Sequence, residues 1–266
     1  MDSSYEFKLL DDIKNGDIID IGFIITLKNS DRNYKKELEY FNPCKKVIIV
    51  YNNFGYLDNN KELCKKNYIF DLIYSYYMTF KYSLHNYPNK NILILEDDFI
   101  WNKNINLENH LNIINKFLKN KNNYCYNLGC LPFFGMKYNN THSLMKLVAG
   151  NQSVIYHPES IKKFVEKYES CKCSIICIEK FLCNNSNYFI YKKPLTYQYW
   201  GDIKDKKKPY TIMNMDAFNV DYKYAKIITN VMIKCFKVLS LDKFNENGEK
   251  NFNIFYNLFN KITSKI

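Results

Sequence analysis

The sequence predicts an α/β fold, with a sheet that has helices on both faces and a helical extension at its carboxyl end. Three apolar runs, at 18–28, 45–53 and 91–98, have the length and the β-branched composition of buried strands. Residues 67–86, between the second and the third run, carry apolar side chains at helical intervals. This alternation of strand and helix is typical of α/β sheets with helices on both faces.

The remaining elements follow from the same periodicities. We expect residues 1–16 to be polar and irregular. Later elements are predicted as a helix at 105–119, strands at 123–134 and 147–157 (the latter bent at Gly150 and Asn151), a helix that begins at Pro158, a strand at 187–193, and helices at 218–240 and 252–264. These elements predict one domain at 17–210 and a helical carboxyl-terminal extension at 211–266 that packs on it.

The basic charge of the chain is weak evidence for a nucleic-acid partner. The 266 residues carry a formal net charge of +11, and Arg32 is the sole arginine. Abundant Lys, Asn, Ile and Tyr indicate an AT-rich genome, for example that of a large DNA virus, and codon bias of that kind spreads lysines over a surface. A basic surface by itself is compatible with nucleic-acid binding, but here we expect nucleic acid not to be the partner.

The chain lacks the patterns that predict secretion or membrane insertion. There is no run of about 18 apolar residues, and the first residues do not have the basic and apolar regions of a signal peptide. Nine cysteines occur without a disulfide framework. We therefore expect a cytoplasmic protein with reduced thiols (host cytoplasm or virus factory if viral). A peripheral membrane contact through the apolar stripe near 220–238 remains an alternative.

The third apolar run ends in three adjacent carboxylates, Glu96, Asp97 and Asp98. Such groups repel one another and are costly to bury unless a cation lies among them. In extended backbone Glu96 and Asp98 share one face and Asp97 lies on the other. Two carboxylates on one face suit Mg²⁺ or Mn²⁺. The alternative is that the strand ends at Leu95 and solvent takes the charges.

The segment NILILEDDFIW resembles the acidic strand motif of family 25-like glycosyltransferases, the group that includes lipooligosaccharide and procollagen galactosyltransferases. FIITLKNSDR, KVIIVYN, IEKFL and KKPLTYQYW are similar, in order, to other elements of that group, so the resemblance covers about 20–200. It implies a GT-A fold, a Rossmann-like mixed sheet. It also implies metal-dependent, inverting hexosyl transfer from a nucleotide diphosphate sugar, with UDP the expected nucleotide, to a hydroxyl of a glycan, protein or lipid.

The resemblance assigns a role to each matching residue. It implies that Asp98 is the main ligand of Mn²⁺ or Mg²⁺, that Glu96 contacts the metal through water or contacts the ribose, and that Asp97 contacts the donor sugar or positions its loop. Thr26, Leu27, Arg32, Tyr51, Asn52 and Gln198 are assigned to donor or nucleotide contacts, and Glu179 is assigned as general base.

Each of these outer residues also has an ordinary interpretation. Arg32 can be a surface residue, Tyr51 and Asn52 a strand exit, Gln198 a packed loop residue, and Glu179 a carboxylate at a helix start. The family has Asp where this chain has Glu179, and that departure motivates a second hypothesis, a GT-A-shaped binding protein without catalysis. A third is a phosphoryl-transfer enzyme or a nucleic-acid binder.

Overall fold

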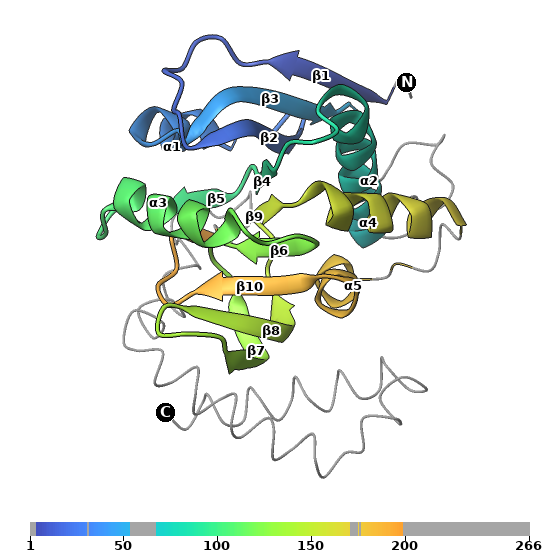
Figure 1. The fold of residues 1–266 in the computed structure, drawn as a ribbon. Helices are drawn as coiled ribbons and strands as arrows, with labels where there is room; N and C mark the ends of the chain where they lie inside the picture. The colour runs from blue at the N-terminus through green and yellow to red at the C-terminus, as the bar shows by residue number, and fades with distance from the viewer. Residues whose placement is uncertain (1–3, 31, 54–67, 171–174, 176, 199–266) are drawn as a thin grey trace, which may run out of the picture.

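The computed structural model describes residues 4–30, 32–53, 68–170, 175 and 177–198, shown in colour in Figure 1. Over these ranges the chain has a mixed α/β fold with a nine-stranded sheet, a two-stranded sheet and five helices. The predicted helices at 218–240 and 252–264, and the boundary at 210, lie outside the described residues. Every helix in the described ranges falls short, in length or in apolar character, of what a membrane crossing needs.

Strands and helices alternate through the first half of the chain. The strands are β1 (Tyr5–Leu9), β2 (Ile19–Leu27), β3 (Cys44–Asn52), β4 (Ile92–Glu96), β5 (Phe99–Trp101), β6 (Tyr124–Asn127), β7 (Leu131–Lys137), β8 (His142–Ala149), β9 (Ser153–Tyr156), β10 (Asn187–Tyr191) and β11 (Thr196–Gln198). The helices are α1 (Tyr34–Tyr40), α2 (Tyr68–Asn86), α3 (Leu107–Leu118), α4 (Pro158–Ser170) and α5 (Ile178–Asn185).

The order of strands in the large sheet places a reversal of winding between β2 and β4. The order is β1-β3-β2-β4-β9-β6-β10-β8-β7. β2 pairs in parallel with β3 on one side and with β4 on the other. In open α/β sheets, ligands bind outside the carboxyl ends of the strands at such a switch point. Ile25 and Glu96 are register partners, so the ends of β2 and β4 meet at that edge.

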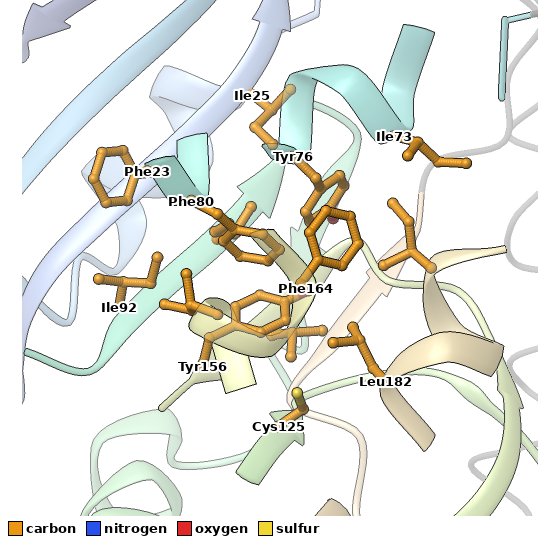
Figure 2. Close-up of a cluster of buried hydrophobic side chains, with 14 of the residues drawn as sticks. Phe23, Ile25, Ile73, Tyr76, Phe80, Ile92, Cys125, Tyr156, Phe164 and Leu182 are labelled. Carbon is orange, nitrogen blue, oxygen red and sulfur yellow. The ribbon is translucent and has the colours of Figure 1, made fainter. Parts of the chain in front are cut away.

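Two apolar cores, one on each face of the sheet, hold this edge in place. In β4, Ile92 and Ile94 belong to the core formed with α2, α4 and α5, whereas Leu93 and Leu95 belong to the core formed with α1 and α3. Figure 2 shows the first core, where rings from the helices gather over Tyr156 of β9. Alternate residues of a strand point to opposite faces, so the strand is buried on both sides.

The long elements predicted from periodicity are confirmed. The strands predicted at 18–28 and 45–53 and the helix at 67–86 match β2, β3 and α2. The acidic strand is β4, and the helix at 105–119, the helix from Pro158 and the strand at 187–193 match α3, α4 and β10.

Three expectations are wrong. Residues 1–16 are not all irregular, because β1 pairs antiparallel with β3 from Tyr5 to Leu9, and the large sheet therefore begins before residue 17. The single strands predicted at 123–134 and 147–157 are each two strands, β6 with β7 and β8 with β9. The first pair is separated where the Asn127 side chain accepts a hydrogen bond from the Gly129 N–H at 2.8 Å. The second is separated at Gly150, whose φ of 91° interrupts the extended backbone.

Candidate functional site

The three adjacent carboxylates form a turn at the carboxyl end of β4. β4 ends at Glu96, and Asp97 and Asp98 make the turn into β5. The backbone of the turn is held from both sides, because the Asp97 N–H donates to Ile25 O at 3.1 Å and the Glu96 N–H donates to Gln152 O at 2.9 Å. Extended backbone therefore stops at Glu96, and the predicted alternation of side chains does not continue through Asp98.

Asp97 is held by the loop that follows β2. Its Oδ2 atom accepts hydrogen bonds from the Thr26 hydroxyl at 2.6 Å and from the Ser30 hydroxyl at 2.8 Å. The Asp97 side chain is 16% exposed. The loop after β2 and the acidic turn after β4 are thus one connected unit.

Arg32 supplies a positive charge beside two of the carboxylates. Its Nη1 lies 3.1 Å from Asp98 Oδ2, and its Nε lies 3.5 Å from Asp97 Oδ1. The side chain is 26% exposed, so it lies against the acidic turn more than in solvent. A planar guanidinium can contact two acceptors at once, which a lysine ammonium does less well.

The Glu96 side chain reaches Tyr76 of α2. Its Oε1 atom lies 2.8 Å from the hydroxyl of Tyr76. Burial raises the pKa of Glu96 to about 8, and the negative charge of Asp98 adds to the rise. Because a nearby positive charge favours the ionised form of a carboxyl, a cation bound between Glu96 and Asp98 would lower this pKa.

The predicted nucleotide contacts lie around the same edge, with one exception. Leu27 is 49% exposed. Burial raises the pKa of Tyr34, and the neighbouring Tyr51 and the charge of Asp97 add to the rise. The Asn52 amide instead donates to Asp71 of α2 at 2.8 Å in the protein interior. Asn52 is 2% exposed, so its side chain belongs to the protein interior.

Glu179 and Gln198 come from distant parts of the chain. Glu179 lies in the first turn of α5, where it accepts hydrogen bonds from the Gly150 N–H at 3.2 Å and the Cys177 thiol at 3.4 Å. Through the Gly150 N–H it is joined to the loop whose Gln152 carbonyl accepts from the Glu96 N–H. The backbone of Gln198 pairs with Phe99, the residue after Asp98. The Gln198 side chain lies outside what the structure describes.

Sequence reasoning missed Ser30 and Tyr76. Ser30 lies in the polar loop after β2, where any of several polar residues is an equally good candidate. Tyr76 falls on the apolar stripe of a helix, and such residues are usually core. It is a core residue here, with 0% exposure, yet its hydroxyl also reaches Glu96. Neither contact leaves a signal in local sequence.

The donor set at the turn fits a cation that is shared with a ligand. Among the described residues, no group of three or more His, Cys, Asp or Glu side chains is arranged to hold a metal ion. Mg²⁺, however, is commonly bound by one or two carboxylates together with substrate phosphates and water. Glu96 and Asp98 are such a pair, which suits an ion that bridges to a phosphate.

Comparison with known proteins gives no family assignment. No protein-family model matches the chain. No curated protein matches it either. The similarity to family 25-like glycosyltransferases therefore remains a resemblance of motifs and their order.

Proposed function

We propose that this protein is a metal-dependent glycosyltransferase with a GT-A-like fold, which moves a sugar from a nucleotide diphosphate sugar to an acceptor hydroxyl. The observation that carries the proposal is the position of the acidic turn. Glu96, Asp97 and Asp98 lie at the carboxyl ends of β2 and β4, where the winding of the sheet reverses. Ligands of open α/β sheets bind at that position.

The residues of the turn suit a diphosphate donor. Glu96 and Asp98 would hold Mn²⁺ or Mg²⁺, which as a Lewis acid stabilises the negative charge that develops on the departing diphosphate. Arg32, 3.1 Å from Asp98, would reach the same phosphates with two N–H groups. Asp97, fixed by Thr26 and Ser30, would accept hydrogen bonds from donor-sugar hydroxyls.

Glu179 is the candidate general base. In inverting transfer, the acceptor hydroxyl loses its proton as its oxygen bonds to the anomeric carbon, and the bond from that carbon to the phosphate oxygen breaks. Glu179 has one oxygen on the Gly150 N–H and the other near the Cys177 thiol. A carboxylate with these neutral partners keeps acceptor capacity for a hydroxyl proton.

Ligand-induced stabilisation tests the donor site. We expect one nucleotide among UDP, GDP and CMP, with its sugars, to raise the melting temperature in the presence of Mn²⁺, because a ligand bound to the folded state alone stabilises it. Asp98→Asn should weaken that binding by about tenfold or more, since a bridging carboxylate is lost. Asp12→Asn is the matched control, because Asp12 forms an exposed ion pair with Lys35.

Turnover separates the proposal from its alternatives. We expect Mn²⁺-dependent release of the nucleotide when the donor sugar is offered with glycan, peptide and lipid acceptors. Binding of the nucleotide without any turnover would favour the non-catalytic hypothesis. The proposed function would be contradicted if no nucleotide binds at millimolar concentration and if the protein instead binds nucleic acid with an affinity that falls steeply as salt is added.

A further inference from the structure

A short loop, Gly150–Gln152 between β8 and β9, lies between the donor carboxylates and Glu179. The Glu96 N–H donates to Gln152 O at 2.9 Å, and the Gly150 N–H donates to Glu179 Oε1 at 3.2 Å. The backbone of Glu96 and the carboxylate of Glu179 are thus both hydrogen-bonded to the same three residues. The position of this loop therefore affects the position of each carboxylate relative to the other.

On the donor side, the loop is joined to Glu96 through Tyr76. The Tyr76 hydroxyl lies 2.8 Å from Glu96 Oε1 and 2.9 Å from the carbonyl oxygen of Asn151. Tyr76 is fully buried in the core between the sheet and α2, as Figure 2 shows, so its ring has little freedom to move. One hydroxyl thus lies against both the carboxylate and the loop backbone, and its single proton is available to either acceptor.

On the other side, the Asn127 side chain holds Gly150. The Asn127 amide donates to Gly150 O at 2.8 Å, and Gly150 has a φ of 91°. This backbone conformation is strained for residues with a side chain. The Gly150 N–H that meets Glu179 is consequently set by the conformation of the loop and by Asn127, at the end of β6.

The Asn151 side chain completes a buried chain of hydrogen bonds. Its amide group donates to the Tyr156 hydroxyl at 2.7 Å, and its Oδ1 atom accepts from the Tyr188 hydroxyl at 3.2 Å. Tyr188 in turn accepts from the Asn127 amide at 2.7 Å. Asn127, Asn151, Tyr156 and Tyr188 are all at most 4% exposed. Buried polar groups are costly unless they are paired, and a paired network is rigid.

We propose that this network is a positioning device, in which Tyr76 and Asn151 set the location of Glu96 relative to Glu179. The inference rests on the proposed function, since it assigns Glu96 to the donor side and Glu179 to the acceptor side. A displacement of about 1 Å between reacting groups costs on the order of 100-fold in rate. Neither Tyr76 nor Asn151 needs to touch a substrate to have this effect.

A double-mutant cycle on kcat tests the inference. Tyr76→Phe removes the bridging hydroxyl and keeps the ring. We expect it to lower kcat by about 10-fold or more in the wild-type background. In a Glu179→Gln background it should lower kcat by less than about threefold, because the base relative to which Tyr76 positions Glu96 is already absent. Equal losses in both backgrounds would overturn the inference, since a purely structural defect does not depend on Glu179.

Hydrogen exchange of the Gly150 amide gives a second measurement that does not need activity. We expect Tyr76→Phe to accelerate this exchange by about 10-fold or more, because the loop loses its attachment to α2. Tyr124→Phe is the matched control, since the Tyr124 hydroxyl is buried and has no hydrogen-bond partner among the described residues. Unchanged protection of Gly150 in Tyr76→Phe would contradict the inference.

The two measurements distinguish the failure of the inference from the failure of the proposed function. If the wild-type protein turns over a nucleotide sugar but the cycle is additive, the positioning role is wrong and the glycosyltransferase proposal stands. If the wild-type protein neither binds nor turns over any nucleotide sugar, the proposed function fails and the catalytic role of the network fails with it.

Discussion

The single arginine of the chain, Arg32, lies beside the acidic turn. Arg32 lies within 3.5 Å of Asp97 and within 3.1 Å of Asp98. Without it, three neighbouring carboxylates would face one another with partial burial, which is unfavourable. On the proposed function, Arg32 would offset part of this negative charge in the metal-free protein and would turn to phosphate when a divalent ion takes over that role.

This interpretation predicts an effect of Mn²⁺ on Arg32→Gln. In the absence of metal, the substitution should lower the free energy of unfolding by about 1–2 kcal/mol, less than for a fully buried pair because the group is partly exposed. Mn²⁺ alone should then raise the melting temperature of Arg32→Gln more than that of the wild type, since the ion replaces the missing charge. Thermal unfolding with and without Mn²⁺ measures both effects.

An exposed ion pair serves as the control for Arg32. Lys28 lies 3.4 Å from Glu6, with side chains that are 54% and 47% exposed. Lys28→Gln should change the free energy of unfolding by less than about 0.5 kcal/mol and should not alter the response to Mn²⁺. If Mn²⁺ stabilises the wild type, Arg32→Gln and Lys28→Gln equally, the ion does not bind at the acidic turn.

Among the secondary-structure elements, the small sheet of β5 and β11 brings the end of the described chain to the acidic turn. β11 pairs antiparallel with β5, with Gln198 opposite Phe99. This small sheet is attached to the segment after β6, because the Leu195 N–H donates to Leu128 O at 2.6 Å. Gly129 lies so close to this strand that an added Cβ would overlap the carbonyl oxygen of Thr196.

Gly129→Ala should therefore displace β11. We expect a loss of about 2–4 kcal/mol in the free energy of unfolding, because the new methyl group meets backbone that cannot rotate away. Gly22→Ala is the comparison, since its Cβ would lie 2.7 Å from a side-chain atom, Cys44 Sγ, and not from backbone. Urea unfolding measures both. If Gly129→Ala lowers the free energy of unfolding no more than Gly22→Ala does, β11 is only loosely attached to the segment after β6.

The same elements show how far the sequence predicts the fold. Long apolar runs such as β2 and β4 were predicted because burial on both faces leaves a continuous hydrophobic stretch. β5 and β11 have three residues each and α1 has seven, too few for a periodicity to emerge. The alternation in YEFKL of β1 was present, but charged residues within it favoured an irregular segment.

The part of the candidate site that depends on neighbouring parallel strands could be predicted from the sequence, and the part that depends on helix packing could not. The meeting of Thr26 with the acidic turn follows from the parallel strands β2 and β4, whose ends share an edge. The approach of Glu179 to the loop at Gly150 depends on how α5 packs, and the Tyr76 contact depends on the rotation of α2. Such long-range placements are determined by tertiary packing, which a single sequence does not display.

At the scale of the whole molecule, the position of the acidic turn depends on both apolar cores, since β4 is buried on both faces. The second core extends across the sheet to its far side, where His142 of β8 stacks on Phe117 of α3 with ring centroids 3.8 Å apart. His142 is 4% exposed, and its Nε2 atom has no hydrogen-bond partner among the described residues. Burial lowers the pKa of His142 to about 4, with further contributions from Lys121 and Lys192.

Acid should therefore destabilise the whole fold through His142. Above the unfolded-state pKa of 6.5 the imidazole is neutral in both states and the stability is fully present. As the pH falls from 6.5 to about 4, the unfolded state takes up the proton first, so stability is lost, by about 3 kcal/mol. His142→Gln should make the free energy of unfolding less dependent on pH in this window, whereas His85→Gln, at an exposed position of α2, should not. Urea unfolding at several pH values measures the slopes. Equal slopes in wild type and His142→Gln would mean that the buried imidazole is not the acid-sensitive group, because the substitution leaves every other titrating residue in place.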